Sequence, residues 1–151
     1  DNPVAHYQST GPEIWKESDG VVTHFISCMG TTGTIVGVAR YLKEQNPAIQ
    51  VIGVQPIEGC QIAGMRNWSP QYFPSIYDPY LIDDVIEISP ELAGETVRRL
   101  AQEEGIFIEP TSATSLAAAE ALVTLGVIGE NDTVLLPLTG AGIKEPIPEL
   151  P

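Results

Sequence analysis

The sequence predicts an α/β fold in which helices cover both faces of a mainly parallel, twisted sheet. Apolar runs of branched and aromatic residues alternate with helix-forming segments along the chain. The first strand–helix–strand unit spans residues 21–55, and its two strands should pair in parallel with a right-handed crossover. A length of 151 residues fits one domain. We therefore expect residues 1–151 to form a single α/β domain.

The first third of the chain supplies the elements of that unit in order. A helix is expected to start at Ser9–Glu13, where a hydroxyl cap, a first-turn proline and an acidic residue favour a helix N-terminus. Residues 21–27 form a continuous apolar run, typical of a strand buried on both faces, and His24 within it is expected to be a hydrogen-bonded core residue. A helix then ends near Asn46, and residues 50–55 form the second strand.

A long loop and a second set of elements complete the predicted domain. Residues 56–84 hold four prolines, and a loop of this length in a compact domain is usually either functional or disordered. Its aromatic residues favour an ordered, packed loop. The elements expected after it are a strand over residues 84–88, a helix from Ser89 to Gly105, an alanine-rich helix from Thr111 to Leu125 and a last strand over residues 133–138.

The composition excludes several classes of function. Twenty acidic residues against seven basic ones give a formal net charge of −13, which disfavours nucleic acid and anionic membranes as partners. Residues 1–4 lack the pattern of a signal peptide, and the longest uncharged window, Gly20–Ala39, is too rich in glycine and threonine for a membrane span. Cys28 and Cys60 form neither a CxxC pair nor a metal-ligand cluster. We expect two reduced thiols in a cytoplasmic protein without a metal site, and a disulfide between them stays open.

The two ends of the chain indicate part of a longer protein. The sequence begins with Asp1 instead of an initiator methionine, and its last residues, 146–151, are rich in proline. We therefore expect this chain to be a portion of a larger protein.

The strongest local signal for function is Gly-Thr-Thr-Gly-Thr at residues 30–34, between the first strand and its helix. Glycine permits the tight turn, backbone N–H groups and hydroxyls supply donors, and the helix N-terminus favours an anion, so a phosphate is expected here. The segment is not a GxxxxGK[ST] loop, because no lysine lies between Lys16 and Lys43. A dinucleotide site would need GxGxxG and an acidic residue where Gln55 stands.

One arginine stands alone in the long loop. Arg66 is the only cation in the sequence between Val51 and Glu95. A guanidinium near a phosphate site is suited to contact a further anionic group, so Arg66 is a candidate ligand-binding residue. No GxSxG or HExxH pattern supports hydrolytic chemistry.

Several segments together resemble the cysteine synthases. They are Asn2-Pro3, His6, Thr-Gly-Pro-Glu-Ile-Trp at 10–15, Phe-Ile-Ser-Cys-Met-Gly-Thr-Thr-Gly-Thr at 25–34 and Gly37-Val38. Residues 56–59, 62–68, 73–78 and 105–107 are similar to the B isozyme more than to the A isozyme. These enzymes are the O-acetylserine sulfhydrylases, in the β family (fold type II) of pyridoxal-phosphate enzymes.

The resemblance implies the C-terminal half of a two-domain, homodimeric transferase that uses pyridoxal 5′-phosphate. Its substrates would be a small amino acid and a sulfur donor, and an O-activated serine would become cysteine or S-sulfocysteine. By resemblance, Ser112 contacts the pyridine nitrogen, with Thr139 as the second available hydroxyl; a hydroxyl partner leaves that nitrogen unprotonated and favours β-elimination and replacement. The expected cofactor-binding residues are Gly30, Thr31, Thr32, Gly33, Thr34, Ser112 and Thr139, and the expected substrate-binding residue is Arg66.

Two features depart from the cysteine synthases. Residues 109–113 and 138–146 are similar to threonine synthases and dehydratases of the same superfamily, in which Thr139 would be the partner of the ring nitrogen. The family's Schiff-base lysine has no match, because Lys16, Lys43 and Lys144 lack the Ser/Thr-x-Lys context. We expect that lysine upstream of residue 1, so no catalytic residue and no activity are expected in this chain alone.

Two alternatives stay open at this point. Within the same superfamily, the protein is a threonine synthase or a serine/threonine dehydratase. Outside it, the chain is a non-catalytic phosphate-binding α/β module.

Overall fold

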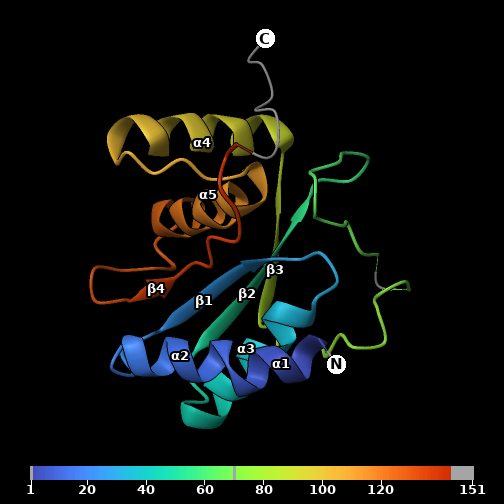
Figure 1. The fold of residues 1–151 in the computed structure, drawn as a ribbon, viewed down its shortest axis with the longest axis vertical. Helices are drawn as coiled ribbons and strands as arrows, with labels where there is room; N and C mark the ends of the chain where they lie inside the picture. Colours follow the sequence, from blue (N-terminus) through green and yellow to red (C-terminus); the bar gives the residue numbers. More distant parts are fainter. Residues whose placement is uncertain (1, 70, 144–151) are drawn as a thin grey trace.

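The computed structural model describes residues 2–69 and 71–143, which contain a four-stranded sheet in the order β3-β2-β1-β4 (Figure 1). The strands are β1 (His24–Cys28), β2 (Gln50–Pro56), β3 (Asp84–Ile88) and β4 (Val134–Leu135). Each pairing is parallel, with Phe25 opposite Val51 in the central pair. The predicted parallel sheet is therefore confirmed.

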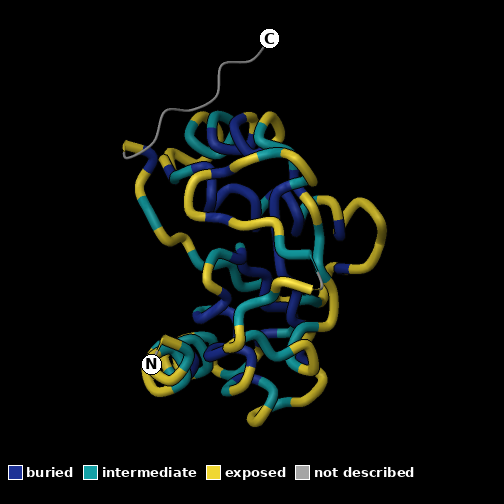
Figure 2. The backbone as a smooth tube through the Cα atoms, turned by 90° about the vertical axis from the view of Figure 1, so that its right-hand side faces the viewer, coloured by how far each residue is buried: buried dark blue, intermediate teal, exposed yellow. Residues whose placement is uncertain are grey.

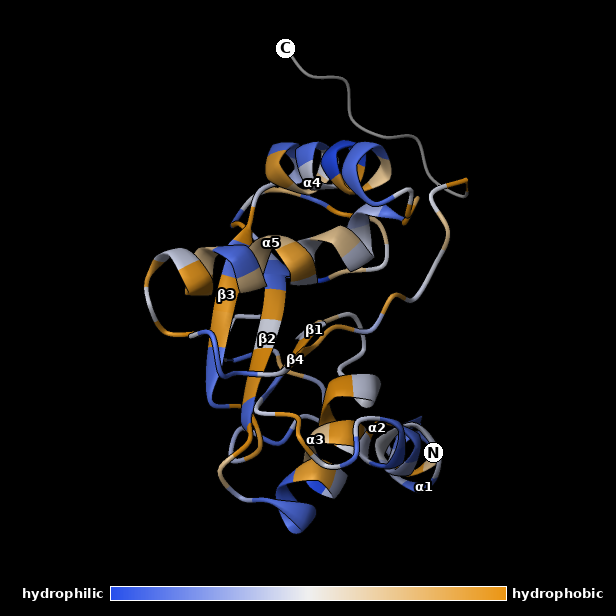
Figure 3. Ribbon diagram, turned by 90° about the vertical axis from the view of Figure 1, so that its left-hand side faces the viewer, coloured by the Kyte–Doolittle hydropathy of each residue, from blue (hydrophilic) through white to orange (hydrophobic). Residues whose placement is uncertain are grey.

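Helices cover both faces of this sheet, as the sequence predicts (Figure 1). One face carries α1 (Asn2–Gln8), α2 (Thr10–Glu17) and α3 (Gly33–Gln45). The other face carries α5 (Pro110–Thr124), and α4 (Pro90–Glu103) packs on the outside of α5. Most residues of β1, β2 and α5 are buried, and the buried backbone lies inside the molecule in Figure 2. Figure 3 shows hydrophobic residues along the strands.

The core is divided between the two faces because neighbouring residues of a strand point in opposite directions. Phe25 of β1 is fully buried against the α3 side, together with Ile35 and Leu42. Ile26, the next residue, is fully buried on the α5 side, where Ala118 contributes. The small side chains of α5 let this helix pack closely between the sheet and α4.

The structure corrects two boundaries that the sequence predicts. Helix α1 precedes the expected start at Ser9, and the Ser9 hydroxyl donates to the carbonyl of Ala5 at 2.8 Å instead of capping α2. The last strand covers two residues and not 133–138. Pro137 has no backbone N–H for a sheet ladder, and the chain leaves the sheet toward α5.

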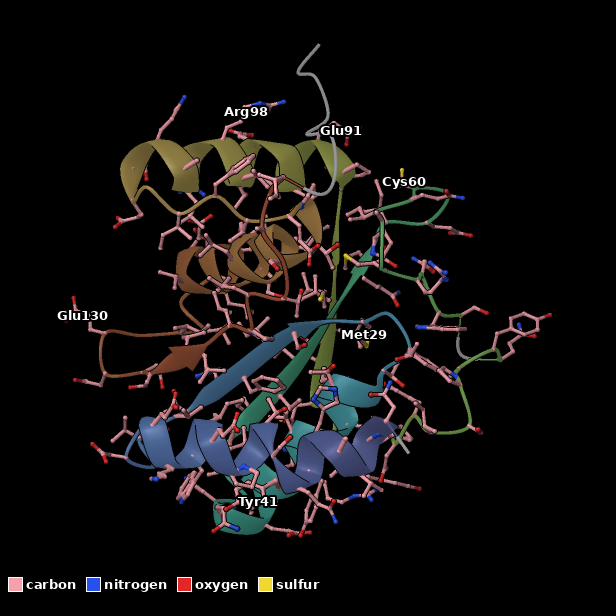
Figure 4. The ribbon with its side chains drawn as sticks, viewed as in Figure 1. Met29, Tyr41, Cys60, Glu91, Arg98 and Glu130 are labelled. Carbon is pink, nitrogen blue, oxygen red and sulfur yellow. The ribbon has the colours of Figure 1, made fainter. Side chains whose placement is uncertain are left out.

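The buried position predicted for His24 is confirmed. His24 is buried, with its Nδ1 2.8 Å from the Thr23 hydroxyl and 3.7 Å from the carboxylate of Asp132. Cys28 and Cys60 are both free thiols, and Cys60 lies on the segment after β2 at the outside of the molecule (Figure 4). No helix in the described part of the chain is long and apolar enough to span a membrane.

The long loop between β2 and β3 is packed in part, with Ile62 and Met65 buried, whereas Tyr72 on the same loop is largely exposed. The rings of Phe73 and Tyr77 are stacked with centroids 3.8 Å apart. The Trp68 indole donates to the carbonyl of Gly30 at 2.9 Å, and the backbone N–H of Arg66 donates to the carbonyl of Met29 at 3.0 Å. These bonds hold the loop against the end of β1, where Met29 lies (Figure 4).

Candidate functional site

A cavity of about 340 Å³ lies at the carboxyl end of β1. Ligand sites of open α/β sheets lie outside the carboxyl ends of the strands. The cavity is lined by Cys28, Gly30, Thr31, Thr32, Gly33, Thr34, Ile35, Ala63, Gly64, Glu109, Thr111 and Thr139. The structure thus brings the predicted segment 30–34 and Thr139 to one site, although more than a hundred positions separate them in the sequence.

The loop between β1 and α3 has the geometry of an anion-binding turn. Thr32 has a left-handed backbone (φ 69°), and α3 begins at the next residue, Gly33. The first amides of a helix have no partners within that helix and carry its positive dipole end. The hydroxyl oxygen of Thr32 is buried and has no hydrogen-bond partner, so a donor that could serve an anion is present in the loop. These features fit the phosphate of pyridoxal 5′-phosphate.

Close backbone contacts explain the glycines of this loop. A Cβ on Gly30 would lie 2.5 Å from the carbonyl oxygen of Gly64, on the opposite wall of the cavity. A Cβ on Gly33 would lie 2.3 Å from the side chain of Asn2. A side chain at position 30 or 33 would therefore collide with Gly64 or Asn2, and glycine at both positions avoids this collision.

Two residues from α1 support the loop, and sequence reasoning assigned them no role. The Asn2 amide donates to the Thr31 hydroxyl at 3.0 Å. The imidazole of His6 lies between the hydroxyls of Thr34, at 3.1 Å, and Thr10, at 2.9 Å. Asn2 and His6 are among the residues that resemble the cysteine synthases, and this resemblance is the sequence feature that could have indicated their role.

The far wall of the cavity contains a connected set of polar groups. Thr139 lines the cavity, and its Oγ1 lies 3.1 Å from the Oγ of Ser112 and 2.8 Å from Oε1 of Glu109. Ser112 is fully buried and does not line the cavity, and its Oγ accepts the backbone N–H of Thr139 at 2.9 Å. The two hydroxyls that the sequence offers for the ring nitrogen are therefore in contact with each other.

Arg66 lies at a second cavity of about 330 Å³, which shares Gly30, Thr31 and Gly64 with the first. Its side chain is exposed, and one guanidinium nitrogen donates to the carbonyl of Met65 at 2.8 Å. The structure thus places Arg66 beside the glycine–threonine segment 30–34, outside the lining of the first cavity.

Cys28 lines the first cavity but is not an activated nucleophile. Burial raises the pKa of its thiol to about 11, and the carboxylate of Glu109 adds to this increase. The thiol therefore stays protonated at neutral pH. Within residues 2–69 and 71–143, no three His, Cys, Asp or Glu side chains are grouped so that they could hold a metal ion.

The fold and this site together define an α/β domain with a glycine–threonine loop beside a cavity at the carboxyl end of a parallel strand. Residues 1–140 match the family described as "Pyridoxal-phosphate dependent enzyme". The chain therefore belongs to this family, and the predicted cofactor class is confirmed at that level.

Similar proteins include several cysteine synthases. The chain is 56% identical to cysteine synthase B of Pseudomonas aeruginosa over 118 residues, which are 78% of this chain and 40% of that protein. It is 38% identical to the cysteine synthase of Aquifex aeolicus over 145 residues, which are 95% of this chain and 44% of that protein. The chain thus spans less than half the length of these relatives.

Solved structures of similar proteins confirm the fold. A hydrogen sulfide-producing enzyme from Fusobacterium nucleatum superimposes with a TM-score of 0.85 at 30% identity, over 93% of this chain and 50% of that one. A cysteine synthase from Entamoeba histolytica gives a TM-score of 0.78 at 30% identity, over 94% of this chain and 44% of that one.

Proposed function

We propose that the protein containing this chain makes cysteine from an O-activated serine and a sulfur nucleophile by pyridoxal-phosphate-dependent β-replacement. The observation that carries the proposal is one cavity that joins the segment 30–34 to Thr139. The similarity to cysteine synthases of both isozyme classes supports it. With thiosulfate as nucleophile, the product would be S-sulfocysteine. We further expect a homodimeric, cytoplasmic enzyme.

In this proposal, the chain's residues bind and orient the cofactor. The amides at the start of α3 and the threonine hydroxyls of segment 30–34 hold the phosphate. Thr139 contacts the ring nitrogen, and the buried Ser112 orients the Thr139 hydroxyl through the hydrogen bond between the two side chains. Bound pyridoxal phosphate supplies an electron sink that lets the leaving group depart from the serine side chain. The lysine that binds the cofactor covalently is expected upstream of residue 1.

A comparison of two substrate pairs tests this proposal in the full-length protein. We expect cysteine from O-acetylserine and sulfide, and no threonine from O-phosphohomoserine. The second candidate is a threonine synthase or a serine/threonine dehydratase. The cavity lining favours this candidate in one respect, because Thr139 reaches the cavity and Ser112 does not. Turnover of O-phosphohomoserine, threonine or serine without cysteine formation would decide for the second candidate.

Arg66→Ala should weaken the use of anionic substrates selectively. We propose that the exposed Arg66 guanidinium contacts an O-phosphoserine phosphate or a thiosulfate in the second cavity. Losing one charge-assisted hydrogen bond costs about 2 kcal/mol, or roughly 30-fold in kcat/KM. The measurement is kcat/KM of the full-length enzyme for the anionic substrate, with O-acetylserine and sulfide as the control pair. Equal losses for both pairs would assign Arg66 a structural role.

Thr139→Val and Ser112→Ala should separate the two hydroxyls. Thr139→Val removes the group that lines the cavity, so we expect a shifted absorption band of the bound cofactor and roughly 10-fold weaker affinity. Ser112→Ala leaves the Thr139 hydroxyl in place and should shift the band less. The measurement is the absorption spectrum during titration of each apoprotein with pyridoxal phosphate. A silent Thr139→Val beside a perturbed Ser112→Ala would make Ser112 the partner of the ring nitrogen.

A further inference from the structure

A buried glutamine near the carboxyl end of β2 has no role in the proposed function. Gln55 is 7% exposed, and both the oxygen and the nitrogen of its side-chain amide are hydrogen-bonded. Its Oε1 accepts the backbone N–H of Trp68 at 3.2 Å, and its Nε2 donates to Oε1 of Glu87 at 3.1 Å. A backbone N–H can only donate and an ionised carboxylate can only accept, so these two contacts fix the orientation of the amide.

Glu87 also holds the loop residue that precedes Trp68. The Asn67 side-chain amide donates to Oε1 of Glu87 at 3.1 Å and to the carbonyl of Pro56 at 2.6 Å. Glu87 lies opposite Gln55 in the parallel pair of β2 and β3. Side chains from two neighbouring strands therefore bind the loop at two consecutive positions, 67 and 68.

Trp68 connects this cluster to segment 30–34. Its indole N–H donates to the carbonyl of Gly30 at 2.9 Å. Glycine has no Cβ to restrict its backbone, so the peptide between Gly30 and Thr31 could rotate if its carbonyl had no partner. In a trans peptide the N–H points opposite to the carbonyl, and the indole therefore directs the N–H of Thr31 away from Trp68.

We propose that Gln55 positions Trp68 so that the indole orients the Gly30–Thr31 peptide for binding the phosphate of pyridoxal 5′-phosphate. The inference rests on the proposed function, because it takes the N–H of Thr31 as one of the amides of segment 30–34 that hold the phosphate. Thr31 lines both cavities, whereas Trp68 lines only the second, so an N–H directed away from Trp68 is suited to serve the first cavity. Gln55 is a positioning residue, because it acts through Trp68 and lines neither cavity.

Exchanging the side chains of Gln55 and Glu87 tests this proposal. Gln55→Glu places a second carboxylate at the 3.1 Å contact with Glu87, so repulsion should displace residue 55 and Trp68 with it. Combining Gln55→Glu with Glu87→Gln restores one amide and one carboxylate. The carboxylate at position 55 can then accept from Trp68 and from the amide at position 87, whose oxygen can accept from Asn67.

The measured quantity is the ratio of the affinities of the full-length apoprotein for pyridoxal 5′-phosphate and for pyridoxal, which differ only in the phosphate. We expect Gln55→Glu to lower this ratio roughly 10-fold, about the value of one hydrogen bond, and the double variant to stay within about 3-fold of the wild type. The matched control is Gln102→Glu, the same substitution at an exposed residue of α4, and it should leave the ratio unchanged. A residue needed only for folding would lower the stability without changing the ratio.

If Gln55→Glu does not fold, Trp68→Phe removes the indole N–H, keeps an aromatic ring and should lower the ratio by the same factor. An unchanged ratio in Gln55→Glu or in Trp68→Phe overturns the role of Gln55 but leaves the proposed function standing. A double variant whose ratio is as low as that of Gln55→Glu also overturns this role. A wild-type protein that binds no pyridoxal phosphate overturns both.

Discussion

Gly30→Ala should lower the affinity of the full-length protein for pyridoxal phosphate by roughly 100-fold. The added Cβ would lie 2.5 Å from the Gly64 carbonyl oxygen, which is backbone and has no side-chain rotation to relieve the contact. The phosphate loop and the opposite wall of the cavity must then move apart. The Trp68 indole, which donates to the Gly30 carbonyl, would be displaced with them. Fluorescence titration of the apoprotein measures the change.

Gly129→Ala is the matched control for this substitution. The Cβ added there would lie 3.8 Å from its nearest neighbour, an oxygen of Asp132, which is an ordinary van der Waals distance, and Gly129 does not line either cavity. We expect unchanged affinity in this variant. If Gly30→Ala binds pyridoxal phosphate as tightly as Gly129→Ala does, the loop is not the phosphate site.

Phe25→Ala should lower the free energy of unfolding by about 3–5 kcal/mol, the usual cost of truncating a fully buried phenylalanine. Phe25 is 0% exposed in the centre of β1 and packs between the sheet and α3. Its loss opens a cavity beneath the helix whose N-terminus forms part of the phosphate loop. Denaturant unfolding of the full-length protein measures the effect, with or without the cofactor.

Val21→Ala serves as the control for stability. Val21 precedes β1 and is 57% exposed, so its truncation should change the free energy of unfolding by less than about 0.5 kcal/mol. If Phe25→Ala lowered the free energy of unfolding by as little as Val21→Ala does, this result would contradict the packing of β1 between two helical layers.

The sequence predicts the features that depend on local chemistry. Residues 21–27 are β-branched and aromatic enough to predict a strand, which the structure places slightly later, at His24–Cys28, and the glycines and threonines at 30–34 predict the turn after it. The packed loop is anticipated for the same reason, because Trp68 and Phe73 need apolar surroundings. Each of these residue patterns lies within a few positions of the strand, turn or loop that it predicts.

The features that the sequence does not predict depend on contacts between distant segments. Helix α1 has no strong signal of its own, and it is held against α3 by His6, whose imidazole reaches Thr34. The hydrogen bond from the Thr139 hydroxyl to Glu109 joins residues that are thirty positions apart in the sequence. Only the fold shows that Thr139 reaches the cavity while Ser112 is buried behind it. Pattern and propensity carry no information about such pairings.

The assignment of segment 30–34 as the phosphate site is tested by comparing the affinity of the full-length apoprotein for pyridoxal 5′-phosphate with its affinity for pyridoxal. The two molecules differ only in the phosphate that segment 30–34 is proposed to hold. If the amides at the start of α3 and the hydroxyl of Thr32 bind that phosphate, pyridoxal 5′-phosphate should bind at least roughly 100-fold more tightly, the value of about two charge-assisted hydrogen bonds. Equal affinity for the two molecules would contradict the assignment of the glycine–threonine loop as the phosphate site.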